Sequence, residues 1–232
     1  VQRAHLIDPM APSPSLELLL HAFVPHKYVD HTHATALLSL IDQPNGAEFC
    51  REVYGDRVGL VPYVRPGFGL ARKAAETFDR DRKVEGLILD KHGIFTFGES
   101  AREAYERMIE KVTAAEERLQ KNRKPVFVPA ALPKHIASAT QIAPTLRGAV
   151  ALTNDKSEGT AKRQILCFRS DAKILNYVNG AELSRYSQMG VATPDHTIRT
   201  KNWPLVVPAP DASKLDQWSK DVHQAVNSFI AN

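Results

Sequence analysis

The first 120 residues alternate short apolar segments with amphipathic ones, and this alternation limits the folds that the chain can adopt. Residues 26–33 and 58–64 predict strands, and residues 84–98 predict two strands that meet at His92-Gly93. The segments between them carry apolar residues at helical spacing. This strand–helix alternation favours an α/β or α+β domain.

The C-terminal half has a different character, and the change near residues 122–130 predicts a domain break. Residues 164–169 predict a further strand, and the proline-rich run 191–211 predicts a loop with one short strand. In the first helix, Ser13 is predicted to act as the cap and Pro14 fits the first turn. The predicted helices of the whole chain lie at residues 12–24, 34–41, 46–55, 70–78, 99–120, 180–190 and 212–230, and residues 130–149 are predicted to be helix and loop.

The charge pattern argues against nucleic-acid binding. The net charge of this 232-residue chain is +4, and its basic residues mostly alternate with acidic ones, as on a solvated helix face. A modest positive bias suits an anionic small-molecule substrate. The sequence shows no export signal and no membrane span, and Cys50 and Cys167 lie too far apart to indicate a disulfide framework. We therefore expect a cytoplasmic protein.

Two histidines in the segment "VDHTH" (residues 29–33) raise the question of a metal site. Residues i and i+2 of a strand point to the same face, so His31 and His33 can reach one atom, although such a pair also fits two surface histidines. His92, at the predicted strand junction, adds a third imidazole, and three imidazoles with an open position are the ligands of a catalytic zinc. Glu17 lies among leucines that would raise its pKa by burial, and it is the candidate acid–base group.

The sequence alone does not assign a functional role to four further polar residues. His21 and His26 are predicted to pack against the core rather than to bind a ligand. His196 and Arg199 lie in "TPDHTIRTK", a polar run within an apolar segment. Such a run fits a structural turn, a site or an interface.

The order of four motifs resembles that of the class II aldolase/adducin family. The motifs are "PSLELLL", the "HTH" strand, "RPGFGLA" and "KHGIFTFG" with the long helix after it, and they cover roughly residues 12–120. A later segment, "SQMGVATPDHTIRTKNWPLVV", resembles the end of the aldolase half of bifunctional aldolase/short-chain dehydrogenase proteins. These proteins relate to the rhamnulose-phosphate aldolase/alcohol dehydrogenase fusions.

The resemblance implies a three-layer α/β/α fold with a mainly antiparallel central sheet. It implies an aldolase-like core over residues 1–122 and a C-terminal extension over residues 123–232. No GxGxxG follows a predicted strand, so we expect the dehydrogenase domain of the fusions to be absent from this chain. By analogy with the family we also expect a homo-oligomer, commonly a tetramer.

The resemblance also implies roles for the candidate residues. It implies that Glu17 is the acid–base residue, with Zn²⁺ as the expected divalent metal. By position, the metal ligands implied are His31, His33 and His92.

Three other residues match positions that the family uses for the substrate. Ser13 and Ser15 fall where the family holds the substrate phosphate. Tyr63 lies near a tyrosine that in some members donates a proton at a neighbouring subunit's site.

These implications predict a metal-dependent lyase. We expect it to cleave a sugar phosphate, a ketose 1-phosphate, into dihydroxyacetone phosphate and an aldehyde. The alternatives are an epimerase or decarboxylase on the same fold, the aldolase-like domain of a short-chain dehydrogenase fusion, and a non-catalytic, adducin-like assembly module.

Overall fold

The computed structural model describes residues 2–121, 127–153, 161–162 and 164–231, and these form two compact units. The first unit comprises Val1–Arg123 and Val191–Thr200, and the second comprises Lys124–Gly190 and Lys201–Asn232. Much of the domain break predicted near residues 122–130 lies outside the described residues. Each unit is described by itself.

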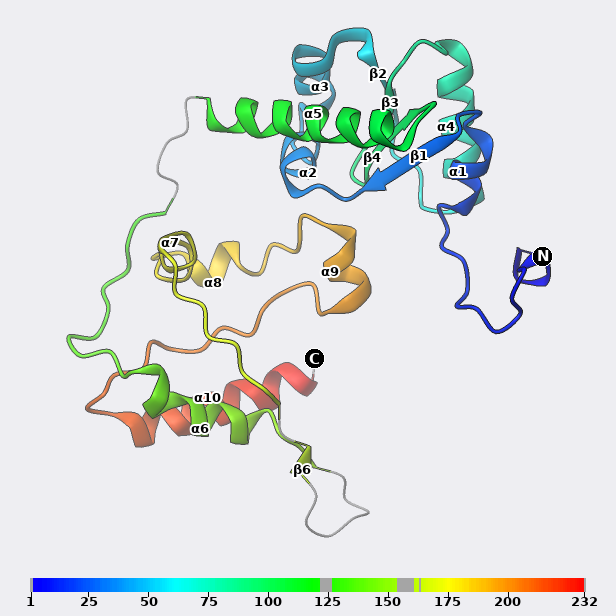
Figure 1. Cartoon of the computed structure of the whole chain (residues 1–232). Helices are drawn as coiled ribbons and strands as arrows, with labels where there is room; N and C mark the ends of the chain where they lie inside the picture. Colours follow the sequence, from blue (N-terminus) through cyan, green and yellow to red (C-terminus); the bar gives the residue numbers. More distant parts are fainter. Residues whose placement is uncertain (1, 122–126, 154–160, 163, 232) are drawn as a thin grey trace. The chain divides into compact units, whose positions relative to one another are not determined.

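A four-stranded sheet forms the centre of the first unit, in the order β1-β4-β3-β2 (Figure 1). Strand β4 pairs antiparallel with β1 and β3, and β2 pairs parallel with β3. The sheet is therefore mainly antiparallel, as predicted. The strands are β1 (Tyr28–Thr32), β2 (Val58–Val61), β3 (Gly86–Leu89) and β4 (Gly93–Gly98).

Helices cover both faces of this sheet, which makes three layers. Successive strand residues point to opposite faces, so Leu87 and Phe95 pack with α1 and α4, whereas Ile88 and Ile94 pack with α2, α3 and α5. The predicted three-layer α/β/α arrangement is thus confirmed. The helices of this unit that precede α9 (Pro194–Arg199) are α1 (Leu18–Phe23), α2 (Thr35–Ile41), α3 (Gly46–Tyr54), α4 (Phe68–Arg80), α5 (Ala101–Gln120) and the short 3₁₀ helices η1 (Gln2–His5) and η2 (Gly55–Arg57).

The first predicted helix is wrong at its start. Helix α1 begins at Leu18 rather than near residue 12, and Ser13 does not cap it. Ser13 precedes Pro14, and a residue before proline is disfavoured in the α region. The segment before Leu18 therefore stays outside the helix and carries Glu17 at its end.

A short helix also lies where a loop was predicted. Helix α9 (Pro194–Arg199) belongs to the first unit, although it follows that unit's sheet by about a hundred residues of sequence. The sequence held a signal for it, because Pro194 is at the first turn and Asp195 follows it, both typical of a helix start.

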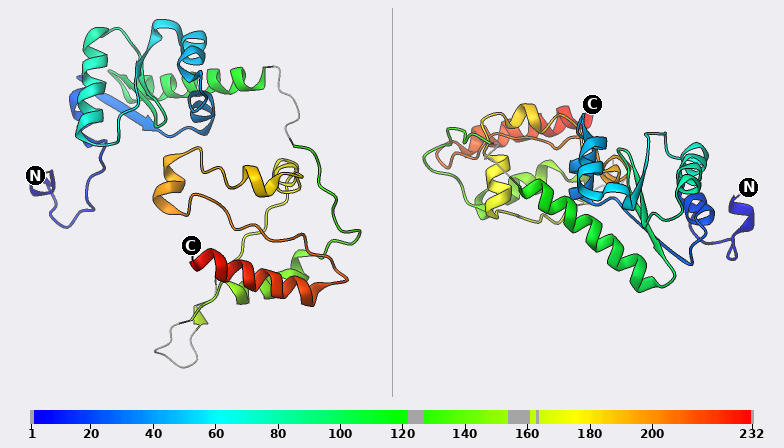
Figure 2. Two further views of the ribbon diagram at one scale, coloured as in Figure 1. Left: turned by 180° about the vertical axis from the view of Figure 1, so that it is seen from behind. Right: turned by 90° about the horizontal axis from the view of Figure 1, so that it is seen from above.

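The second unit is built around two helices, α6 and α10, which lie alongside each other (Figure 2). Trp218 and Val222 of α10 are buried against Ile142 and Leu146 of α6. The Trp218 Nε1–H donates a 2.8 Å hydrogen bond to the Pro208 carbonyl, which satisfies the buried indole. The elements are α6 (Ala139–Ala149), β5 (Leu152–Thr153), β6 (Ala161–Lys162), α7 (Ala172–Val178), α8 (Leu183–Tyr186) and α10 (Leu215–Ala231).

The strand predicted at residues 164–169 is wrong. These residues form no regular element, and Ile165 is 96% exposed. Strand propensity needs a neighbouring strand to pair with, and the described residues offer none to this segment. The predicted helix 180–190 is shorter than expected and ends at Tyr186.

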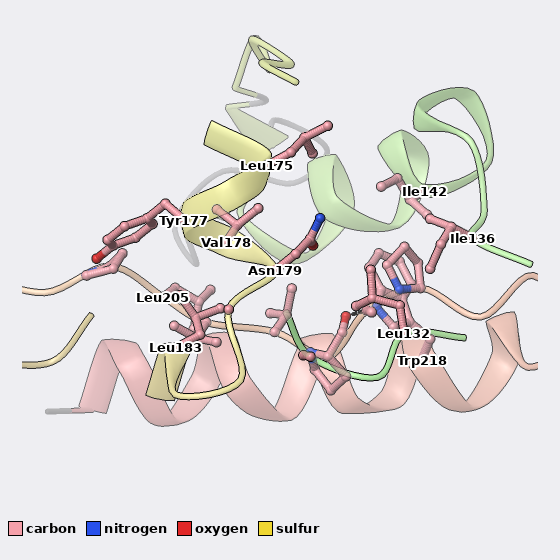
Figure 3. Close-up of a pocket in the computed structure, with 18 of the residues that line it drawn as sticks. Leu132, Ile136, Ile142, Leu175, Tyr177, Val178, Asn179, Leu183, Leu205 and Trp218 are labelled. Atoms are coloured by element: carbon pink, nitrogen blue, oxygen red, sulfur yellow. Dashed lines mark hydrogen bonds between the residues drawn. The ribbon is translucent and has the colours of Figure 1, made fainter. Parts of the chain in front are cut away.

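The second unit contains an apolar pocket of about 730 Å³ (Figure 3). Leu175 of α7, Ile142 of α6 and Trp218 of α10 lie around it. None of its described lining residues carries a charge, so the pocket offers no acid–base pair for catalysis. Among the helices of the described residues, none is long and apolar enough to cross a membrane.

One buried hydroxyl ties helix α3 to helix α5. Tyr54 is buried, and its hydroxyl donates a 2.8 Å hydrogen bond to the backbone carbonyl of Lys111. We expect Tyr54→Phe to lower the free energy of unfolding by about 0.5–1.5 kcal/mol, measured in urea, because a net hydrogen bond is lost without a cavity. Tyr105→Phe, at an exposed position of α5, is the control and should change nothing; equal values for both variants would contradict this prediction.

Candidate metal centre

Four side chains converge at one end of the sheet of the first unit. Glu17, His31, His33 and His92 each offer one ligand atom, and these atoms all lie within 4.8 Å of one another. Glu17 precedes α1, His31 lies on β1, His33 follows β1, and His92 precedes β4. The structure therefore brings together the three predicted metal ligands and the predicted acid–base residue.

The ring of His31 is held in one orientation by the sheet. Its Nδ1 lies 2.9 Å from the carbonyl oxygen of Ile94 on the neighbouring strand, and the ring stacks on Phe95 with centroids 4.1 Å apart. A carbonyl only accepts, so Nδ1 carries the proton. Burial lowers the pKa of His31 to about 4, so the ring is neutral near pH 7 and its Nε2 presents a lone pair.

The ring of His33 is held from a different part of the chain. Its Nδ1 lies 2.9 Å from Asp195 Oδ2, on helix α9. A carboxylate also only accepts, so this Nδ1 carries a proton as well. The remaining nitrogen, Nε2, lies 3.1 Å from the Nε2 of His31.

The distance between these two nitrogens is the strongest sign of a metal. Two lone pairs 3.1 Å apart repel each other unless a proton or a cation lies between them. Two ligands of a tetrahedral zinc, each at the usual Zn–N distance, lie about 3.3 Å apart. The outer partners of the rings, a carbonyl and a carboxylate, are those that ligating histidines usually have. The residues present thus fit a divalent metal.

His92 supplies a third buried nitrogen. It lies in the three-residue connection between β3 and β4, where Lys91 takes a left-handed φ of 56° and the His92 N–H donates a 3.1 Å bond to the Leu89 carbonyl. The residue is 5% exposed. Its Nε2 lies 3.4 Å from Glu17 Oε1 and makes no hydrogen bond within the described part of the chain. Burial lowers the pKa of His92, so this ring too favours a neutral, ligating form.

Glu17 is ionised, contrary to the expectation from sequence. Burial raises the pKa of its carboxyl, but the hydrogen bond from Ser15 Oγ, the local backbone bond and the nearby His31 and His92 outweigh burial, and the net pKa is lowered. The leucines beside it leave the carboxyl partly accessible, so burial is incomplete. The group is a carboxylate able to ligate a cation or accept a proton.

A pocket of about 510 Å³ opens at these side chains. Tyr63, 59% exposed, lines it together with Lys91. Of the two predicted phosphate-binding serines, Ser15 reaches the centre through Glu17, whereas Ser13 is exposed and is not one of the lining residues. Lys91 was not predicted, whereas the α9 residues of this wall belong to the run "TPDHTIRTK", for which the sequence left a turn, a site or an interface open.

The three histidines without an assigned role, His21, His26 and His196, contact other side chains of the first unit. The ring of His21 packs edge-on against Phe95 and that of His26 stacks on Phe97, as their predicted packing requires. His196 Nδ1 lies 2.7 Å from Thr193 Oγ1, at the start of helix α9.

Comparison with known protein families agrees with this geometry. Residues 3–119 match the Class II Aldolase and Adducin N-terminal domain, and residues 137–232 match the domain described as Aldolase class II, second domain. The chain belongs to the class II aldolase and adducin family. The resemblance seen in the four sequence motifs is therefore confirmed, whereas the dehydrogenase fusion stays a prediction.

One curated relative is similar to nearly the whole of this chain. The protein named "Uncharacterized oxidoreductase YuxG" from Bacillus subtilis (strain 168) is 34% identical over 236 residues, which cover 97% of this chain and 33% of that protein. The chain thus spans about a third of the length of this curated relative.

Two solved structures are also similar. The N-terminal Class II Aldolase domain of a conserved protein from Thermoplasma acidophilum is 38% identical, with a TM-score of 0.47 and coverage of 51% of this chain and 54% of that one. The sugar-phosphate aldolase from Thermotoga maritima is 23% identical, with a TM-score of 0.41 and coverage of 50% and 58%.

Gly93 allows the two histidines to approach the β3–β4 junction. A Cβ at Gly93 would lie 2.5 Å from the Thr32 carbonyl oxygen, 3.0 Å from the His33 ring and 3.1 Å from the His31 ring. We expect Gly93→Ala to lower the free energy of unfolding by roughly 1–3 kcal/mol through overpacking. It should also weaken zinc affinity by about tenfold or more, measured by chelator competition, because it displaces both rings.

Gly59→Ala, on strand β2, is the control for this prediction. A Cβ there would lie 2.7 Å from a Leu87 side-chain carbon, an overpacked contact in the same sheet on a strand that carries none of the four site residues. It should cost similar stability and leave zinc affinity nearly unchanged. Equal losses of affinity in both variants would show that Gly93 has no specific role at the site.

Proposed function

We propose that this chain is a metal-dependent, class II aldolase-like lyase that cleaves a ketose 1-phosphate into dihydroxyacetone phosphate and an aldehyde. The observation that carries the proposal is the pair of facing Nε2 atoms of His31 and His33, with His92 and the Glu17 carboxylate beside them. Membership of the family supports the lyase chemistry.

We propose His31, His33 and His92 as the ligands of a Zn²⁺ ion, with Glu17 able to join them when no substrate is present. When bound, such an ion acts as a Lewis acid and stabilises the negative charge that develops on the substrate's carbonyl oxygen as the carbon–carbon bond breaks. The outer hydrogen bonds to Ile94 and Asp195 keep the two imidazoles directed at it.

Glu17 is the proposed acid–base residue at the carbon that loses its bond. Its lowered pKa keeps it ionised, so in the condensation direction it can take the proton from that carbon. In cleavage it delivers to the same carbon a proton that it has taken up from solvent. One oxygen, Oε2, accepts from Ser15, and the other, Oε1, faces His92 Nε2 at 3.4 Å. The carboxylate is thus held beside the imidazoles while it exchanges the proton.

The other predicted residues serve the ends of the substrate. Tyr63 lines the same pocket and is the proposed proton donor to the aldehyde oxygen in the condensation direction; in cleavage the same proton leaves the substrate hydroxyl by way of Tyr63. Lys91, also on the pocket wall, supplies a positive charge that suits a phosphate. Ser13 and Ser15 are the proposed phosphate-binding serines, and Ser15 would have to exchange its bond to Glu17 for one to the substrate.

A second candidate is an aldolase-like domain working within an oxidoreductase. It is favoured by the name of the Bacillus subtilis relative and by the chain's covering a third of that protein. In this case the same site would act on a substrate or product that a dehydrogenase domain also handles.

Metal content tests the ligand set directly. We expect about one zinc per chain in protein purified without chelator, measured by mass spectrometry, and almost none in His31→Ala. His223→Ala, an exposed histidine of helix α10, is the control and should keep its metal. Zinc-free wild type, even after zinc is added back, would overturn the proposal.

Activity tests the role of Glu17. We expect Glu17→Gln to lower kcat for cleavage of ketose 1-phosphates by roughly 10²–10⁴-fold while zinc stays bound through the imidazoles, because the amide cannot exchange a proton. Release of dihydroxyacetone phosphate is the measurement. An unchanged kcat would exclude Glu17 as the acid–base residue.

A further inference from the structure

We propose that Asp195, on helix α9, is a positioning residue of the metal centre: it fixes His33 as the tautomer with its proton on Nδ1 and its Nε2 lone pair directed at the other ligands. The inference rests on the proposed function only in so far as that function needs a metal. It adds a residue of the second family domain to a site otherwise built from the first.

The contact between the two side chains is close, and the imidazole is largely shielded from solvent. Asp195 Oδ2 lies 2.9 Å from His33 Nδ1, with the His33 side chain 16% exposed and the Asp195 side chain 47% exposed. A neutral imidazole has one donor and one acceptor nitrogen, whereas a carboxylate only accepts. The other tautomer would set a lone pair against the carboxylate and a hydrogen where the metal would lie. Asp195 therefore selects the ligating tautomer.

Local contacts order helix α9 at both of its ends and around Asp195. Thr193, nearly buried before the helix, bonds His196 Nδ1 at 2.7 Å, and the Thr200 hydroxyl donates a 2.9 Å bond to the His196 carbonyl at its end. Arg199 lies 3.6 Å from the second oxygen of Asp195. The same helix lines the pocket with Thr197 and Ile198, so it belongs to the site as a wall.

The two paired imidazoles differ in where their outer partners come from. His31 bonds a backbone carbonyl of the adjacent strand, which is present whenever the sheet forms. His33 bonds a side chain 162 residues further along the sequence. The tautomer of His33, unlike that of His31, therefore depends on a single side chain that a substitution can remove.

The first test reads the tautomer in the metal-free full chain. We expect ¹⁵N NMR to show His33 with its proton on Nδ1 in the wild type and on both nitrogens in turn in Asp195→Ala. Asp195→Asn separates positioning from simple packing, because an amide keeps the shape and a hydrogen bond but can also donate. It should give mixed tautomers with an unchanged unfolding midpoint.

The second test measures metal affinity by competition with a chelator, using Zn²⁺ alone and Co²⁺ alone. We expect Asp195→Ala to bind both about 10–100-fold more weakly and to change the Co²⁺ absorption spectrum, as loss of an outer partner does. Asp216→Ala, which removes an exposed carboxylate of helix α10, is the control and should bind like the wild type.

The outcomes separate the two proposals. An Asp195→Ala variant with the wild-type tautomer and wild-type affinity would overturn the role of Asp195. A wild type that binds neither ion would overturn the proposed function, while the tautomer measurement would still decide whether Asp195 orients His33.

Discussion

The close approach of two imidazole nitrogens, His31 Nε2 and His33 Nε2 at 3.1 Å, is the constraint on which the site depends. It follows from strand geometry, because alternate residues share a face, and from the outer bonds that place both protons on Nδ1. Gly93 has no side chain, which leaves room for the two imidazole rings beside it. A sheet that brings two lone pairs together gains stability from a cation between them, so fold and metal affinity are coupled.

The layers explain why the site lies at the ends of β1 and β4. His31 is the last but one residue of β1, and His92 directly precedes β4. Strands β1 and β4 pair with each other, so the two histidines lie close together. The connection before β4 is three residues long, so His92 has little freedom to move. Glu17 is the N-cap of helix α1, at the end of the segment that leads into it. Strand β1 and the residues directly next to β1 and β4 thus carry the imidazoles, and the segment before helix α1 carries the carboxylate.

Local patterns predicted most of the first unit, whereas in the second they predicted helix α10 well and the segments between α6 and α10 poorly. The i, i+2 histidines and the His-Gly junction were visible because their spacing alone places them at one end of a sheet. The ionised state of Glu17 was not, since it depends on Ser15 and on partial solvent access. Asp195 lies too far from His33 in sequence for spacing to connect them. Residues 164–169 have the composition of a strand, but they form none because no neighbouring strand among the described residues pairs with them.

The long sequence interval between His33 and Asp195 has a consequence for biosynthesis. At about 5–20 residues per second, a ribosome makes Asp195 roughly 10–30 s after His33. The sheet can form and offer His31 and His92 during that time, but the third imidazole lacks its orienting carboxylate. On the proposed role of Asp195, a nascent chain would bind metal weakly until synthesis has passed helix α9. Metal loading would then report that most of this chain has been made.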